Sequence, residues 1–242
     1  MSKDLLKYHL SNSPIIEASV EIYCTFNIPN DAVIGVIYTT LTEHKIAIKA
    51  LNKLPICNIP EEIRKSDINL RDKPTHQFIC DEGVILVGNN TLSFGVLPPY
   101  KSWITFQSFI KKVIKYIRDA QIIKGLSRIS IKYLNFFKDN NIFDNINLKI
   151  SLNNNIINNP STVFKTEIIT KSDSIIVLQI TNGVHVKNQL LKLDNNGSLL
   201  DLNVVSKKIS LDTLETVIEN AHTEAKELFF KLLKSDFVKE FM

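Results

Sequence analysis

The stretch NSPIIEASVEIYCTF, residues 12–26, is the most regular strand pattern in the chain, because its apolar residues recur at every second position. A period of two is that of a β-strand with one buried face, and antiparallel sheets commonly leave the other face in water. Glu17 and Glu21 share that second face and lie about 13 Å apart along the strand. Glycosidase acid/base pairs are about 5–9.5 Å apart. We therefore expect the two carboxylates to be solvated or ion-paired, not a catalytic pair.

A second alternating stretch, LSRISIKYLNFF at residues 126–137, has a basic side. If this strand lies beside the first one, Arg128 and Lys132 can face Glu17 and Glu21 as cross-strand partners. Exposed pairs of this kind contribute about 0–1 kcal/mol each. Ion pairing of this kind explains the two carboxylates without assigning them a catalytic role.

Asn135 falls on the apolar side of the same stretch, where a buried amide needs several hydrogen bonds. It is either a structural bracket for a loop or bulge, or part of a polar pocket. Both alternatives stay open at the level of the sequence.

Three segments have the spacing of amphipathic helices. Residues 29–45 begin with Pro29 and Asn30, which are typical of the beginning of a helix. Residues 100–125 carry one apolar stripe and end near Gly125 as a C-cap. Residues 210–233 begin with Ser210 as an N-cap and carry a narrow stripe of leucine and alanine. We expect one short helix and two long ones.

The remaining β-rich segments predict antiparallel meanders. Residues 75–99 read as three strands separated by turns. Beyond an Asn/Asp-rich boundary, further strands are predicted at INLKISL, STVFKTEIIT, SIIVLQITN, QLLKL and SLLDLNVV, with DNNG as a turn. The sequence thus predicts an α+β fold of two related halves, 1–138 and 139–242, each a meander with a long helix, which can also pack as one domain.

Composition excludes several classes of protein. The chain of 242 residues is 44% hydrophobic and 22% charged with net charge +4, which is typical of a folded protein and mild for a duplex-binding domain. Three cysteines without a CxxC pair indicate a reducing compartment. The charged amino terminus MSKDLLKYHLSN and the lack of about 18 consecutive apolar residues predict a cytoplasmic protein without a membrane segment.

No motif of a known reaction occurs in the chain. HExxH, GxSxG, GxGxxG and the phosphate-binding GxxxxGK[ST] pattern are absent, and the histidines are scattered. Glu219 and His222 resemble half of a di-iron carboxylate-histidine arrangement, but no second pair exists. We expect no cofactor and no metal.

Three groups of residues are candidate sites. Late phenylalanines on the closing segment, which exceed one buried stripe, indicate an interface with a protein partner or a second copy, unless they pack on the sheet. A basic cluster indicates nucleic-acid binding, unless it is a solvated face. Polar residues between the halves indicate an enzyme-like pocket. The candidate interface consists of Phe230, Phe237 and Phe241. The basic cluster consists of Lys111, Lys115, Arg118, Arg128 and Lys132. The polar pocket residues are Glu17, Tyr133, Asn135 and His222.

Three places in the chain together resemble a sporadically distributed bacterial family of uncharacterised proteins. The family has an opening Asn-Ala-Pro-Ile-x-Glu-Ala pattern, a central Arg-Tyr-x-Asn strand and a closing helix with His and then Phe. Here Ser13 stands in place of Ala and Lys132 in place of Arg, which puts in doubt any need for a guanidinium there. The matching positions are Asn12, Pro14, Ile15, Glu17, Ala18, Tyr133, Asn135, His222 and Phe229.

The resemblance implies no established activity, and the patchy occurrence of the family points to mobile defence or toxin-antitoxin units. Abundant Asn, Ile and Lys fit an AT-rich bacterial genome. We therefore expect first a non-enzymatic interaction module. The alternatives are a nucleic-acid binder and an enzyme with a pocket between the halves.

Overall fold

The computed structural model describes residues 10–159, 161–207 and 209–242. Residues 1–9, which include the charges of the amino terminus from which a cytoplasmic protein was predicted, lie outside the described part. Helices in the described ranges are α2 (Asn30–Glu43), α3 (Glu61–Ser66), α4 (Trp103–Asp119), α5 (Leu214–Leu232) and α6 (Ser235–Lys239), with 3₁₀ turns at Pro55–Asn58 and Ile142–Asp144. The strands are β1 (Ile15–Phe26), β2 (Ile48–Lys53), β3 (His76–Cys80), β4 (Val84–Val87), β5 (Thr91–Gly95), β6 (Ile123–Lys138), β7 (Ser151–Leu152), β8 (Asn155–Ile156), β9 (Val163–Ile169), β10 (Ile175–Asn188) and β11 (Leu193–Ser206).

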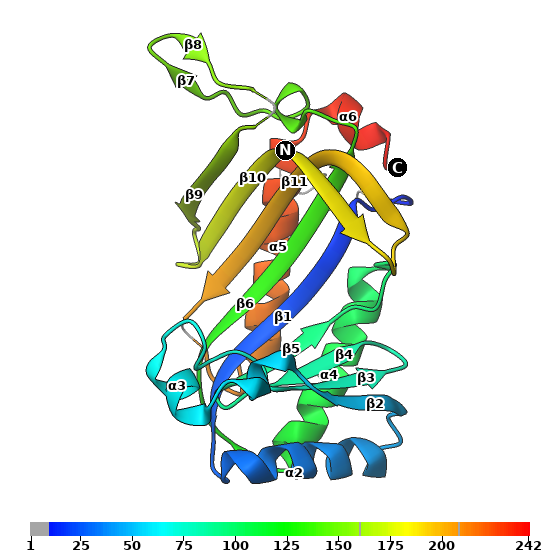
Figure 1. Cartoon of the computed structure of the whole chain (residues 1–242), viewed down its shortest axis with the longest axis vertical. Coiled ribbons are helices and arrows are strands. Elements are labelled where there is room, and N and C mark those ends of the chain that lie inside the picture. Colours follow the sequence, from blue (N-terminus) through cyan, green and yellow to red (C-terminus); the bar gives the residue numbers. More distant parts are fainter. Residues whose placement is uncertain (1–9, 160, 208) are drawn as a thin grey trace.

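The fold is α+β, dominated in the described part of the chain by one nine-stranded antiparallel sheet (Figure 1). The strand order is β2-β3-β4-β5-β1-β6-β11-β10-β9, and β7 and β8 form a separate small hairpin. The sheet continues from β1 and β6 into β11, so it crosses the expected boundary between residues 138 and 139 without a break.

β1 lies at the centre of the sheet, between β5 and β6. Ala18, Val20 and Ile22 are buried, while the residues between them are more exposed, as the alternation predicts. β1 pairs with β6, and Ser19 lies opposite Lys132. The predicted pairing of the two alternating stretches is therefore confirmed.

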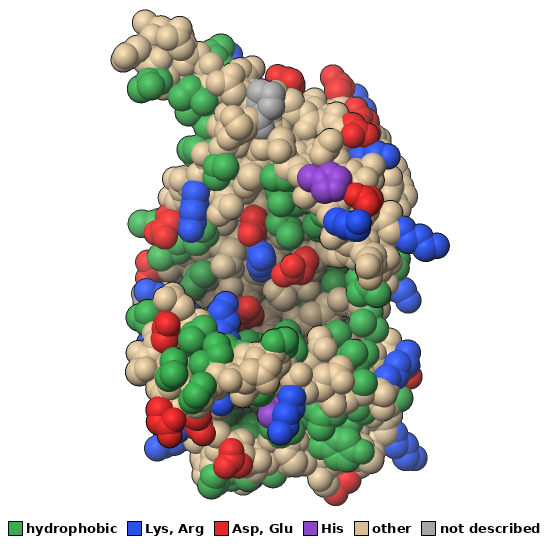
Figure 2. Space-filling model, viewed as in Figure 1, with side chains coloured by type: hydrophobic (Ala, Val, Ile, Leu, Met, Phe, Trp, Pro, Cys, Tyr) green, Lys and Arg blue, Asp and Glu red, His purple; other side chains and the backbone are tan. Residues whose placement is uncertain are grey.

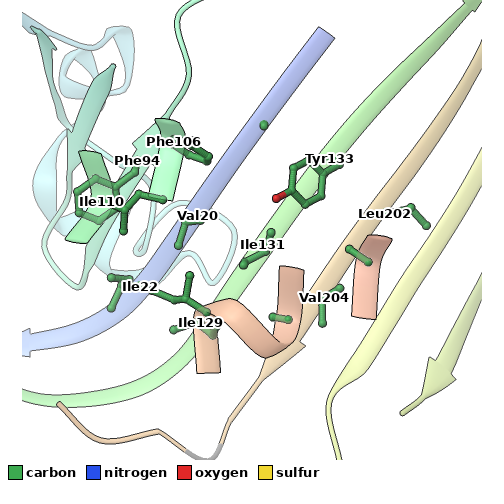
Figure 3. Packing of buried hydrophobic residues seen from close by; sticks show 14 of the residues in the cluster. Val20, Ile22, Phe94, Phe106, Ile110, Ile129, Ile131, Tyr133, Leu202 and Val204 are labelled. Carbon is green, nitrogen blue, oxygen red and sulfur yellow. The ribbon is translucent and has the colours of Figure 1, made fainter. Parts of the chain in front are cut away.

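One face of the sheet is covered by α4 and α5, which lie behind the strands in Figure 1. The core between them draws on β1, β5, β6, β11 and α4, whose buried residues meet in Figure 3. Phe94 on β5 packs edge to face against Phe109 on α4, with ring centroids 6.2 Å apart. Burial of such surfaces stabilises the fold by about 25 cal/mol per Å², and this one cluster includes residues from both sides of the expected boundary.

The predicted helices exist, but two of their ends differ from expectation. α4 ends at Asp119, and Gln121 adopts a positive φ of 54° in the turn that follows. Gly125 is therefore not a C-cap but a residue of β6, opposite Thr25. α5 begins at Leu214, because Ser210 and Thr213 bond to each other in a turn just before it.

The second meander also differs from expectation in its turns. The chain reverses between Asn188 and Leu193, so QLLKL is mostly a turn and DNNG lies inside β11. Gly197 is needed there for close approach, since a Cβ atom would lie 2.2 Å from the carbonyl oxygen of Phe137. INLKISL forms only the two residues of β7.

Candidate functional site

A pocket of about 150 Å³ opens on the helix-covered side of the sheet, where α5, the beginning of α4 and β6 meet. Its walls are mainly aromatic and aliphatic, with a few polar groups among them. The lining residues are Leu10, Ser13, Ile15, Tyr100, Lys101, Ser102, Trp103, Tyr133, Asn135, Leu202, His222, Ala225, Lys226, Phe229 and Phe230.

Local structure explains how these side chains reach one place. Tyr133 and Asn135 are two residues apart on β6 and therefore share its inward face. His222 and Lys226 are four residues apart on α5, so they share one side of that helix. Trp103 opens α4 directly after Ser102, whose side chain caps the helix by accepting a hydrogen bond from the Thr105 amide at 3.2 Å.

His222 is held between two aromatic residues. Its Nδ1 lies 2.8 Å from the hydroxyl of Tyr133, and its ring stacks on Trp103 with centroids 4.1 Å apart at an angle of 11°. The indole Nε1–H of Trp103 donates to Oε2 of Glu219 at 2.9 Å, and Gln107 donates to the same oxygen. Trp103 and Tyr133 thus fix the position of the imidazole from two sides.

The imidazole and the two phenol groups of the pocket are neutral. Burial, with a smaller effect of Lys226, lowers the pKa of His222 to about 3. Burial also raises the pKa of Tyr133 and of Tyr100. The two rings pack edge to face, with their centroids 6.3 Å apart. At neutral pH the site therefore offers an uncharged imidazole and uncharged phenols, which exchange hydrogen bonds without carrying charge.

Asn135 both supports the sheet and lines the pocket. Its side chain is 1% exposed, and its Nδ2 donates to the carbonyl oxygen of Leu200 at 3.1 Å. It lies on β6 opposite Ile15, beside an irregularity in the β1–β6 register. The sequence left a structural role and a pocket role for Asn135 as alternatives. Its side chain has both positions, since it bonds to the backbone of β11 and lines the pocket.

The predicted polar group is only partly brought together. Tyr133, Asn135 and His222 line the same pocket, although they come from distant parts of the chain. Glu17 does not, because it points to the opposite face of the sheet, where its carboxylate lies 3.7 Å from Nζ of Lys132. Its place among the pocket candidates was wrong for that reason.

The open face of the sheet is polar. Lys132 lies between Glu17 and Asp201, 3.6 Å from the Asp201 carboxylate, whose pKa is raised mainly by burial. The guanidinium of Arg128 lies 3.7 Å from the ring centroid of Tyr23, and the Tyr23 hydroxyl donates to Glu21 at 3.0 Å. The predicted complementarity is confirmed directly for Lys132 and Glu17, whereas Tyr23 stands between Arg128 and Glu21.

This face is hollowed, and acidic and basic side chains gather in the hollow (Figure 2). One end of it is a polar depression of about 220 Å³ between the strands and the loop of residues 68–74. Its charged residues have both signs, since Glu21 and Asp72 lie beside Lys73 and Arg128. The depression therefore selects no single charge in a ligand.

The predicted basic cluster is divided by the sheet. Lys111, Lys115 and Arg118 belong to α4 on the covered face, and Arg118 pairs with Glu215 at 3.3 Å. Arg128 and Lys132 project from the other face, next to the groups just described. The five residues therefore do not form one surface, so the single basic cluster was wrong, while nucleic-acid binding itself stays a prediction.

The predicted aromatic interface is also largely buried. Phe230 and Phe237 are 7% and 4% exposed, and Phe241 packs against the core. Phe237 and Phe241 meet each other and Phe137 with centroids 5.2–5.7 Å apart. The phenylalanines therefore pack back on the sheet, which was the alternative interpretation.

No group of three potential metal ligands occurs in the described ranges. Glu219, which the sequence paired with His222, instead accepts hydrogen bonds from Trp103 and Gln107. None of the helices among the described residues offers an apolar stretch that would span a lipid bilayer.

The sequence did not single out Trp103, Tyr100 or Lys226 as site residues. Trp103 belongs to the apolar stripe of the helix predicted at residues 100–125, and the sequence assigns no role to Lys226. One local signal was present, since Lys226 follows His222 by four residues and so shares its side of α5.

Comparison with known proteins adds no further constraint on the site. No protein-family model matches the chain, and no curated protein matches it either. The family resemblance seen in the three sequence motifs stays a prediction.

Proposed function

We propose that this chain is a binding protein for a small molecule with a ring-sized apolar body and a carboxylate group. The observation that carries the proposal is the meeting of Tyr133, Asn135 and His222 in one mainly apolar pocket. An apolar pocket with a few converging polar groups is the usual form of a small-molecule site.

The size of the pocket limits its ligand. Cavities of about 150 Å³ lined by apolar residues bind benzene, and this pocket has a volume of about 150 Å³. Trp103, Tyr100 and Phe229 offer aromatic walls to a flat or branched hydrocarbon group. A single ring or a short branched chain therefore fits better than a nucleotide.

The charges around the pocket favour an anion. Lys101 and Lys226 are the charged members of the lining, and no carboxylate is found among the described lining residues. Burial lowers the pKa of Lys226, so a nearby anion would stabilise its charged form. A carboxylate at this position would leave the hydrocarbon part of the ligand beside the aromatic walls.

The state of His222 favours binding over proton transfer. An efficient general base has a pKa near the working pH, whereas the pKa of His222 is lowered to about 3. The imidazole then remains neutral and orients a ligand by hydrogen bonding. The pocket lining comes from both of the halves expected from the sequence, since it includes residues up to Asn135 and residues from Leu202 onward. A ligand in the pocket would therefore contact both halves.

The fluorescence of Trp103 tests the proposal without a label, since it is the chain's single tryptophan and lines the pocket. Benzoate should change its emission in a saturable way. Benzyl alcohol has the same ring without the charge and loses the ion pair with the lysine. Its affinity should be at least about tenfold lower, which corresponds to a loss of about 1.4 kcal/mol in binding free energy.

Two lysines on α5 provide matched variants for the same titration. Lys226→Met keeps an apolar stem but removes the charge, and should weaken benzoate about tenfold while leaving benzyl alcohol unchanged. Lys231→Met removes an exposed lysine that pairs with Glu227 outside the pocket, and should alter neither ligand. An emission that does not respond to either compound, or an equal loss in both variants, would contradict the proposal.

A further inference from the structure

The two edges of the nine-stranded sheet differ in how they are protected. β2, at one edge, carries Lys49 and Lys53 without a carboxylate and has an irregular register against β3. Lysines and irregularities are common devices that keep edge strands from pairing. β9, at the other edge, is a regular strand of the sequence VFKTEII, with no strand beyond it in the described part of the chain (Figure 1).

The backbone of β9 has a defined open side. Just before and after the strand, Thr162 accepts from the Asn182 amide at 3.0 Å, and the Thr170 amide donates to Ser174 at 2.9 Å. The register between β9 and β10 is continuous, so the even-numbered residues direct their amide and carbonyl groups to β10. The odd-numbered residues direct theirs to the open edge.

The sequence of β9 is complementary to itself in the antiparallel direction. If Thr166 lies opposite Thr166 of a second copy, Lys165 lies opposite Glu167 and Val163 opposite Ile169. All four residues are odd-numbered and exposed, so the same register pairs their open backbone groups. Val163 and Ile169 are 63% and 76% exposed in the single chain, and the pairing would cover part of each.

The neighbouring registers are disfavoured by charge. A shift that keeps the open backbone groups aligned places either Lys165 opposite Lys165 or Glu167 opposite Glu167, and like charges directly opposite destabilise a strand pair. On the covered face, the chosen register sets Phe164 opposite Ile168, two apolar residues that are partly buried in the single chain. Both faces of β9 thus favour the same alignment.

We propose that β9 is a homodimer interface, through which two copies join edge to edge into one continuous antiparallel sheet. The occupant is a second copy of this chain, because its β9 supplies both the matching charges and the matching backbone direction. This surface lies apart from the pocket and is independent of the ligand proposed for it.

Charge reversal tests the proposed register. The mass of the unmodified protein, measured by analytical ultracentrifugation at about 100 μM to allow for a small interface, should approach that of a dimer. Lys165→Glu and Glu167→Lys should each weaken the dimer at least about tenfold, because either change places two pairs of like charges across the interface.

The two variants should restore each other. In a mixture of Lys165→Glu and Glu167→Lys proteins every charge pair is opposite again, so a 1:1 heterodimer should form. The double variant should recover the homodimer for the same reason. Lys53→Glu on β2 is the matched control and should leave the dimer unchanged.

A monomer at all concentrations for the unmodified protein would overturn the proposal. So would a dimer that survives both single reversals, or single variants that remain monomeric when mixed. Circular dichroism of each variant shows whether it is folded, and a folded monomeric variant that is rescued only by its counterpart supports the β9 interface.

Discussion

Ile131 and Lys132 are neighbours on β6, but they point to opposite faces of the sheet and to very different surroundings. Ile131 is 0% exposed beneath the helices, on the face where His222 and Tyr133 are neutral. Lys132 lies between Glu17 and Asp201 on the open face. Polar groups are therefore tolerated on the covered face when they are uncharged and hydrogen-bonded, and on the open face as ions near water.

The largest effect should come from truncating the covered neighbour. Ile131→Ala should lower the free energy of unfolding by about 2–5 kcal/mol, because it removes buried methyl groups and leaves a cavity. Urea unfolding at neutral pH measures the change. A loss as small as that of an exposed residue would mean that the two faces are not as different as described.

The neutral state of His222 should appear as a dependence of stability on pH. Unfolded His222 takes up a proton near its usual pKa of 6.5, whereas the folded state resists protonation until about pH 3. The unfolded state therefore binds more protons in this range, and stability falls as the pH falls from about 6.5 towards 3, by about 3 kcal/mol at pH 4.

His222→Gln tests that contribution, because glutamine can still bond to Tyr133 but does not titrate in this range. The loss of stability between pH 7 and pH 4 should be smaller in the variant by about 3 kcal/mol. Chemical unfolding at both pH values gives the difference. Equal losses in variant and parent would show that His222 is not held neutral.

The smallest effect should come from the open face. Lys132→Met should lower the free energy of unfolding by about 1 kcal/mol or less at neutral pH, since its two ion pairs are partly exposed. Burial raises the pKa of Asp201, and the charge of Lys132 lowers it. Removing the lysine therefore makes the ionised form of the Asp201 carboxylate less stable. The effect should shrink in acid, where Asp201 is protonated, and a loss that is constant from pH 7 to pH 4 would contradict this explanation.

Local periodicity predicted the elements that have one buried face. The alternation of residues 12–26 located β1 and its buried side, and the opposite charges of Glu17 and Lys132 located its partner strand. The order of the other strands was not predictable in the same way, because pairing between distant segments leaves no periodic signal. The composition of DNNG predicts a turn, whereas Gly197 in fact allows close packing against Phe137.

The site was predictable only from residue chemistry. Asn135 stands out as an amide among apolar residues, whereas Tyr133 and His222 are polar candidates for a pocket between the halves, and all three line the pocket. Trp103 could not be assigned, since a tryptophan in a helix stripe has the same pattern whether it fills a core or a pocket wall. The failure of the basic cluster has a related cause, because sequence spacing does not tell which face of a sheet a neighbouring helix covers.

If the covered face binds a small carboxylate, as we propose, such a ligand can be located directly in a crystal. Crystals soaked with 4-bromobenzoate should show an anomalous bromine signal inside the pocket, beside Trp103, with the carboxylate directed towards Lys226. A signal in the polar depression beside Arg128 instead, or no bound bromine in crystals with an open pocket, would contradict the claim.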